Sequence, residues 1–247
     1  MADYYNRILR GATTATANYD AGLRAHMLRV YNLMAGALAL TGVVAYGVAN
    51  TPALMNAIYQ VNAQGQLGPT LLGWVVMLAP LAMVFFLSFR IQQMSEGTAQ
   101  LTFWAYAALV GASLASIFLL YTGASIALTF FVTAATFGAM SLYGYTTKRD
   151  LTGFGNFLFM GLIGILIASL ANIFFQSAAV TFVVSVLGVL IFTGLTAWDT
   201  QKIKQTYYAV GGDVAAAGKA AIMGALSLYL DFLNIFLFLL RFMGDRR

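Results

Sequence analysis

The sequence contains very little charge. Of its 247 residues, only 9% are Asp, Glu, Lys or Arg, and 61% are hydrophobic. Soluble domains carry about 25% charged residues, so this scarcity excludes a folded water-soluble domain. Several apolar runs reach the roughly 20 residues that a transmembrane helix needs, and the ~10-residue alternating segments of a membrane β-barrel are not evident. The composition therefore predicts an all-α integral membrane protein.

Cysteine is absent, and histidine occurs once, as His26. The lack of cysteine excludes disulfides, thiolate metal sites and cysteine catalysis. We interpret His26, which stands between Arg24 and Arg29 before the first apolar run, as a membrane-interface residue. No nucleophile–base set or phosphate-binding loop is evident, so we expect neither an enzyme nor a cofactor. The formal charge of +5 comes from helix ends and connections, which is typical of membrane topology, and no nucleic-acid partner is expected.

The hydrophobic segments predict seven transmembrane helices. They cover residues 28–50, 70–91, 98–121, 124–146, 154–175, 178–202 and 219–242. We therefore divide the chain into an N-terminal cytoplasmic tail (1–27), a seven-helix membrane domain (28–242) and a short C-terminal tail (243–247). The N-terminal tail has no short apolar core, so no cleavable signal peptide is predicted.

The distribution of Lys and Arg predicts the orientation, because these residues accumulate on the cytoplasmic side. The connections at 51–69, 122–123 and 176–177 contain none, whereas the N-terminal tail and the alternate connections carry them. The N-terminus is therefore predicted to be cytoplasmic. Seven crossings place the arginines after residue 240 outside, against this rule, and a re-entrant last segment would avoid that. We favour a full crossing, because residues 220–242 are long enough and contain no proline.

Two aspartates fall within apolar runs. Asp199 lies in "LTAWDTQKIKQTY" near the end of the sixth predicted helix, and Asp231 lies near the middle of the seventh, in "SLYLDFLNIF". Their midpoint in the sequence, Ala215, falls in the glycine-rich stretch "GGDVAAAGK", which is a good connection. If the two helices form an antiparallel hairpin there, and the sixth continues past Lys202, the two carboxyl groups lie at the same depth and face each other.

Two close carboxylates in a low-dielectric site do not both ionise easily, so one proton would be shared between them. Such a pair can sense or carry protons, and we expect Arg90, at the end of the second helix, to be its counter-ion. Asn234 and Thr196 add oxygen atoms nearby. A tight Ca²⁺ site needs 6–8 oxygens, so Asp199 and Asp231 favour a passing Ca²⁺ ion over a storage site. The structural alternatives are an Asp199 that only reaches the headgroups and an Arg90 that only anchors the topology.

Four segments carry a resemblance to a known family. "LTAWDTQKIKQTY" together with "ALSLYLDFLNIFLFLLRFMG" closely resembles the paired C-terminal signature of the Bax inhibitor-1 family, in its bacterial branch. "LRVYNLMAGALALTGVVAY" and "ASLASIFLLYTGASIALTFFVTAATFGAMSLYGYTTKRDL" resemble the family too. The resemblance covers nearly the whole chain from Leu28. It implies a seven-helix fold in the bacterial inner (plasma) membrane, with the last helix enclosed by the other six. It also implies a calcium leak controlled by pH, with Asp199 and Asp231 as the sensor and Arg90, in "LSFRIQ", as its partner.

Three functions follow as hypotheses. The first is a pH-gated cation pathway whose partners are Ca²⁺, protons and the lipid bilayer. The second is a non-transporting modulator of a membrane-bound quality-control protease or another membrane protein, which would depend on Met1–Met27. The third is a proton-coupled carrier for a small solute.

Overall fold

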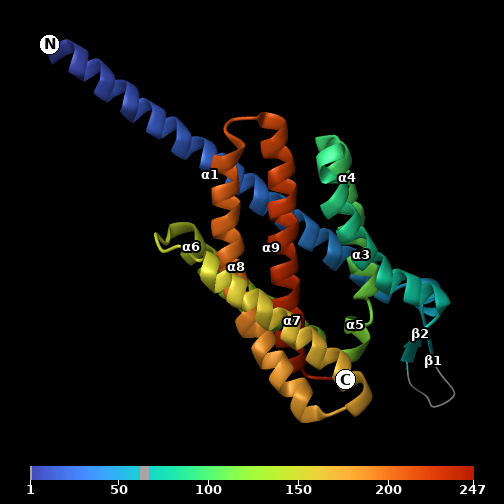
Figure 1. Ribbon diagram of the computed structural model, residues 1–247. Coiled ribbons are helices and arrows are strands. Elements are labelled where there is room, and N and C mark those ends of the chain that lie inside the picture. Colours follow the sequence, from blue (N-terminus) through green and yellow to red (C-terminus); the bar gives the residue numbers. More distant parts are fainter. Residues whose placement is uncertain (1, 62–66) are drawn as a thin grey trace.

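The computed structural model describes residues 2–61 and 67–247, with side chains for 21–60 and 68–247. Within that part, seven helices are long and apolar enough to cross a membrane, as Figure 1 shows. The prediction of an all-α integral membrane protein is confirmed. The membrane-crossing helices are α1 (Ala2–Ala49), α3 (Leu71–Arg90), α4 (Glu96–Ser113), α6 (Gly123–Thr146), α7 (Thr152–Phe175), α8 (Ala178–Val210) and α9 (Val214–Met243).

Shorter elements occupy two of the connections. Helix α2 (Pro52–Ile58) and an antiparallel strand pair, β1 (Tyr59–Val61) and β2 (Leu67–Pro69), join α1 to α3. The 3-10 turn η1 (Ile91–Gln93) follows α3. The third predicted helix is interrupted, because α4 ends at Ser113 and the chain turns before α5 (Ile117–Leu120).

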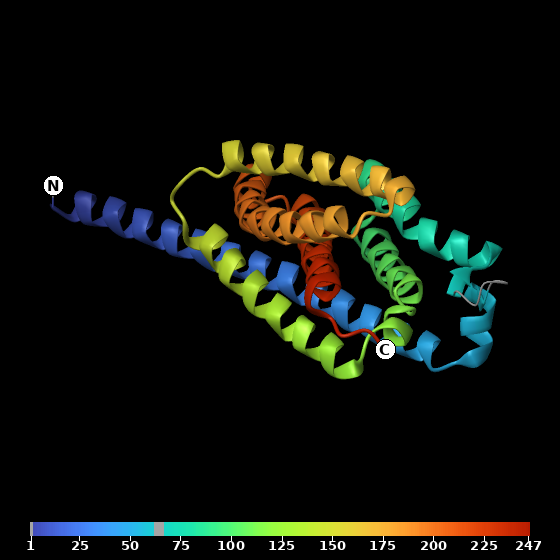
Figure 2. The same cartoon turned by 90° about the horizontal axis from the view of Figure 1, so that it is seen from below.

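Helix α9 forms the centre of the bundle. It packs against α8, α1, α6 and α4, while α3 packs against α4 and α7 against α8, and Figure 2 shows α9 between α1, α6 and α8. The core around it contains side chains with almost no exposure, among them Ile222, Leu228 and Tyr229. Four of the six other membrane helices thus enclose the last one, whereas α3 and α7 pack on the outside of α4 and α8.

Helix α1 runs without a break through the predicted boundary between residues 27 and 28. Leu23, His26 and Met27 are all buried, and the ring of His26 lies 5.1 Å from that of Tyr207 on α8. The side chain of His26 therefore packs inside the protein, against α8, and its place at the membrane interface stays a prediction. The reason is that α8 continues far enough to cover this part of α1.

Helix α9 is continuous over 30 residues, with no reversal inside it. The chain after it pairs with the junction between α5 and α6: Thr122 N donates to Asp245 O (3.1 Å), and Arg247 N donates to Leu120 O (3.1 Å). In Figure 1 the C-terminus lies at the end of the bundle opposite the α8–α9 turn. This geometry agrees with a full crossing and not with a re-entrant segment.

Candidate functional site: a carboxyl pair between α8 and α9

The α8–α9 hairpin sets the level of both aspartates. Helix α8 ends at Val210, so the predicted continuation past Lys202 is confirmed. The turn uses Gly211 (φ 61°) and Gly212 (φ 91°), and these left-handed conformations are readily adopted by glycine. The side chain of Asp213 then caps α9 by accepting from the backbone N–H groups of Ala215 and Ala216.

Two close approaches show the register of the hairpin. Gly224 of α9 lies directly against the side chain of Ile203, and Gly188 of α8 lies against the ring of Phe238. In both places a Cβ atom in place of the glycine hydrogen would come within 3.0 Å of the opposing side chain. The missing side chains let the two helices approach closely along their length, and this register brings Asp199 level with Asp231.

The carboxyl groups of Asp199 and Asp231 lie within hydrogen-bonding range of each other. Asp231 is only 4% exposed, and Asp199 is partly buried. An ionised carboxylate only accepts hydrogen bonds, so a hydrogen bond between the two requires a proton on one of them. In addition, Asp231 Oδ2 is buried and has no hydrogen-bond partner in the described part of the chain. This arrangement therefore suits a pair that holds a proton.

Lys202 is the basic residue that acts on Asp199. It follows Asp199 by three positions and so lies on the same face of α8. Its Nζ is 4.9 Å from the centre of the Trp198 ring, a distance that allows a cation–π interaction. The sequence reasoning missed this residue, although the i, i+3 spacing within "WDTQK" was a usable signal.

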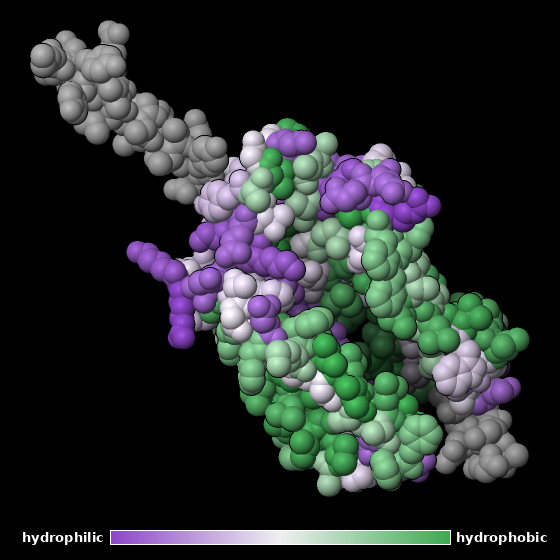
Figure 3. All heavy atoms as spheres, viewed as in Figure 1, coloured by the Kyte–Doolittle hydropathy of each residue, from purple (hydrophilic) through white to green (hydrophobic). Residues whose placement is uncertain are grey.

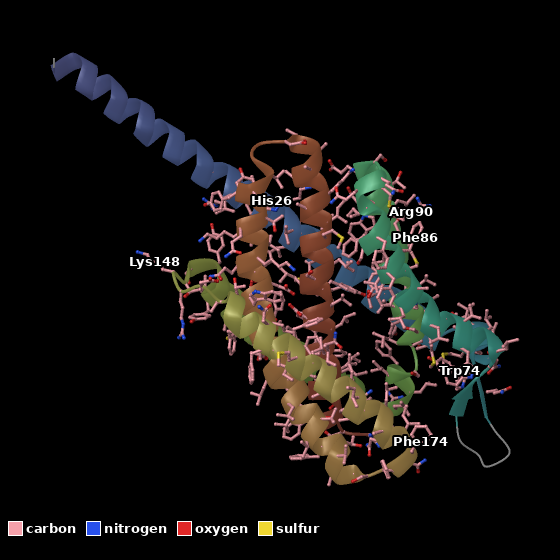
Figure 4. All side chains as sticks on the ribbon, viewed as in Figure 1. His26, Trp74, Phe86, Arg90, Lys148 and Phe174 are labelled. Atoms are coloured by element: carbon pink, nitrogen blue, oxygen red, sulfur yellow. The ribbon has the colours of Figure 1, made fainter. Side chains whose placement is uncertain are left out.

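Arg90 is not placed beside the pair. Its side chain is exposed and donates a hydrogen bond to Gln93 Oε1, and Figure 4 shows it at the end of α3, apart from the α8–α9 hairpin. The expectation that Arg90 acts as counter-ion is therefore not met in this structure. The physical reason is that η1 begins directly after Arg90, and Gln93 in that turn is a nearer partner.

Asn234 and Thr196 also use their donors elsewhere. Asn234 Nδ2 donates to Leu230 O (2.8 Å) within α9, and Thr196 Oγ1 donates to Phe192 O (2.8 Å) within α8. Among the described residues, no group of three or more His, Cys, Asp or Glu side chains lies together. The arrangement therefore offers two carboxyl groups and few further oxygens to an ion.

A cleft of about 330 Å³ leads from the hairpin turn to Asp199. Its polar lining residues are Gln92, Asp199, Lys202, Thr206, Lys219 and Ser227. Lys219 Nζ donates to Gln92 O (2.8 Å), which connects α9 to η1 at the cleft. Hydrophilic residues gather around this end of the bundle in Figure 3, whereas the surface of α7 is hydrophobic. The carboxyl pair is therefore approached from the polar end of the bundle.

Comparison with known protein sequences assigns the chain to a family. A family model described as "Inhibitor of apoptosis-promoting Bax1" matches residues 23–247. The chain belongs to the Bax inhibitor-1 family. A protein of Caulobacter vibrioides is 49% identical over 236 residues (96% of this chain, 94% of its own), and one of Rickettsia prowazekii is 47% identical over the full length of both chains. The Escherichia coli inner membrane protein YbhL is 50% identical over 228 residues, 92% of this chain and 94% of its own.

This membership confirms the resemblance noted in the sequence. Family membership and seven apolar helices together identify a multi-pass membrane protein. The range that the family model matches includes both aspartates, which the α8–α9 hairpin brings together.

Proposed function

We propose that this Bax inhibitor-1 family member is a pH-sensitive leak pathway for cations, with Ca²⁺ as the principal ion, and that Asp199 and Asp231 gate it. We place the protein in the bacterial inner membrane with its N-terminus and the α8–α9 turn in the cytoplasm. The observation that carries the proposal is the contact between two carboxyl groups, of which Asp231 is almost fully buried and Asp199 lines the cleft.

The gating step follows from electrostatics. While the pair holds a proton, the hydrogen bond between the carboxyl groups holds α8 against α9. When the proton leaves, two negative charges face each other in a low-dielectric environment, where their repulsion is much stronger than in water. The repulsion can be relieved by a cation at the pair or by a movement of α9. Lys202 is the nearest internal source of positive charge and would compete with an entering cation.

The experiment is Ca²⁺ flux into liposomes that contain the purified protein and an enclosed calcium dye, measured over a pH series. We expect the flux of Asp199→Asn and Asp231→Asn to lose its pH dependence, because an amide does not titrate. Asp213→Asn is the matched control, since Asp213 caps α9 outside the pair, and its flux should follow pH as the wild type does.

Two outcomes would contradict the proposal. If the Asn variants at the pair keep the wild-type pH profile, the pair is not the sensor. If the wild-type protein carries no Ca²⁺ at any pH while the intact chain has a cellular phenotype that is lost on deleting residues 1–20, the non-transporting modulator of a membrane protease is favoured instead.

A further inference from the structure

The buried face of α6 is a ladder of hydroxyl groups. Ser125, Thr129, Thr133 and Ser141 recur at multiples of four positions, with Phe137 as the one interruption, and each of the five is at most 5% exposed. A row of residues four apart is inclined to the helix axis and winds slowly around it, so that neighbouring members share a face and the row follows the buried side of α6. With a rise of 1.5 Å per residue, the ladder extends over roughly 24 Å, most of the ~30 Å hydrocarbon thickness of a bilayer.

One end of this ladder lies beside the carboxyl pair. Ser141 Oγ is 3.0 Å from Oγ1 of Thr200, the residue after Asp199. Phe232, the residue after Asp231, lies between two rings of α6, at 5.4 Å from Phe130 and 5.6 Å from Phe137. The face of α6 that carries Thr133 therefore packs against α9 at the level of Asp231.

The ladder also contains an oxygen atom without a partner. Thr133 Oγ1 donates to Thr129 O (2.8 Å), but Thr129 Oγ1 is buried and has no hydrogen-bond partner among the described residues. Leaving such a group unpaired destabilises the fold, and a bound water or ion is one explanation for a buried polar group without a protein partner. Asp231 Oδ2, on the neighbouring helix α9, is also buried and without a hydrogen-bond partner among the described residues.

The far end of the ladder is covered by the C-terminal segment. Ser125 Oγ accepts a hydrogen bond from Asp245 N (2.9 Å), and Asp245 O accepts from Thr122 N. Figure 2 shows the C-terminal segment passing the start of α6. The ladder thus reaches from the carboxyl pair to the surface of the bundle opposite the α8–α9 turn.

We infer that the hydroxyl face of α6 lines the second half of the cation pathway, from Asp231 to the C-terminal end of the bundle, with Phe137 and Phe232 as its constriction. The inference rests on the proposed function and extends it to the half of the membrane that the cleft does not reach. Hydroxyl oxygens suit hard cations such as Ca²⁺. A hydrophobic constriction closes a pore by excluding water, so the aromatic contact keeps the pathway shut while α9 remains against α6.

The absence of cysteine makes a direct test available, since any introduced thiol is unique. Thr129→Cys and Thr133→Cys are reconstituted in Ca²⁺-flux liposomes and treated with a cationic methanethiosulfonate, which reacts with thiolates that water reaches. Ala135→Cys is the matched control, because Ala135 is exposed on the opposite side of the same helix. We expect the reagent to reduce Ca²⁺ flux at least about tenfold, as adding a fixed positive charge to a cation pathway should, in the first two variants and to leave the control unchanged.

The constriction is tested in the same liposomes. Phe137→Ala should raise Ca²⁺ flux at the pH where the wild type conducts least, and Phe131→Ala, whose ring is 69% exposed on the lipid side, should not. Phe137→Leu keeps an apolar side chain of similar bulk and should retain the low flux, which separates loss of the constriction from misfolding.

If Ca²⁺ flux depends on Asp231 but the reagent does not reduce it in the Thr129→Cys and Thr133→Cys variants, the inference is overturned and the proposed function still holds. Equal inhibition of the Ala135→Cys control would overturn it as well. If the wild-type protein carries no Ca²⁺ flux, the proposed function is wrong, and the inference that rests on it is wrong too.

Discussion

Helices α7 and α9 are of similar length and hydropathy, yet they occupy opposite environments. Their most apolar windows have a mean hydropathy of 2.3 and 1.9, but 11% of the residues are buried in α7 and 56% in α9. On α7, Phe174 is 86% exposed and lies at the outer edge of the bundle in Figure 4. On α9, Leu228 and Tyr229 are fully buried.

The difference teaches that hydropathy reports whether a helix crosses the membrane and not where it sits in the bundle. The position is set by small and polar residues on defined faces. Gly218 and Gly224 let α9 approach Glu96 of α4 and Ile203 of α8, whereas Gly164 of α7 has nothing within 4 Å of where a Cβ would lie. Lipid tolerates a wide range of apolar side chains, but a protein neighbour accepts only those that fit.

The largest contrast is expected from leucine truncation. Leu228→Ala in α9 should lower the free energy of unfolding by about 2–5 kcal/mol, because it removes a fully buried side chain and leaves a cavity. Leu166→Ala in α7, where the side chain is 55% exposed, should stay within about 0.5 kcal/mol. Unfolding in mixed micelles with increasing SDS measures both, and equal losses would show that the two helices are not packed differently.

A smaller contrast is expected from glycine substitution. Gly211→Ala places a Cβ at φ 61° in the α8–α9 turn, so it should destabilise the protein by about 1–2 kcal/mol. Gly164→Ala in α7 meets no atom and should stabilise its helix by roughly 0.5–1 kcal/mol. The same SDS titration should shift the two variants in opposite directions, and a shift in one direction for both would contradict this.

The smallest effect concerns the start of α7. Hydrogen bonds from the side chain and then the backbone of Thr152 to Asp150 hold the pKa of this exposed carboxyl below its usual value. A lowered pKa means that the stabilisation is present at neutral pH and is lost as the pH falls through that lowered value. Asp150→Asn should therefore have a slightly lower Tm than the wild type at pH 7, and the difference should vanish in acid. A Tm difference that does not change with pH would exclude this account.

The sequence alone was sufficient for several features of the fold and the site. Long apolar runs predict the seven spans, because burying backbone in lipid leaves the helix as the available form. The symmetric placement of Asp199 and Asp231 about a glycine-rich turn was enough to predict that they lie close together, because an antiparallel helix hairpin has few registers. These predictions depend on local periodicity, which a sequence contains.

Other features depended on contacts between distant segments. Arg90 was assigned to the pair from its side of the membrane, but its partner is decided by the η1 turn after it. The contact of His26 with Tyr207 could not be predicted, because nothing in the sequence near His26 indicates that α8 covers it. The cleft beside Lys202 and Lys219 arises where α8, α9 and η1 meet, and no single segment predicts it.

The central position of α9 has a consequence for biosynthesis. The helix that fills the middle of the bundle follows all the others in the chain, so α1, α4, α6 and α8 leave the ribosome before the surface they pack on exists. Their glycines and hydroxyl groups must meanwhile face lipid, water or the insertion machinery. Final assembly therefore waits for α9 to insert, and the contact of its C-terminal segment with Ser125 completes the fold at the end of the bundle opposite the α8–α9 turn.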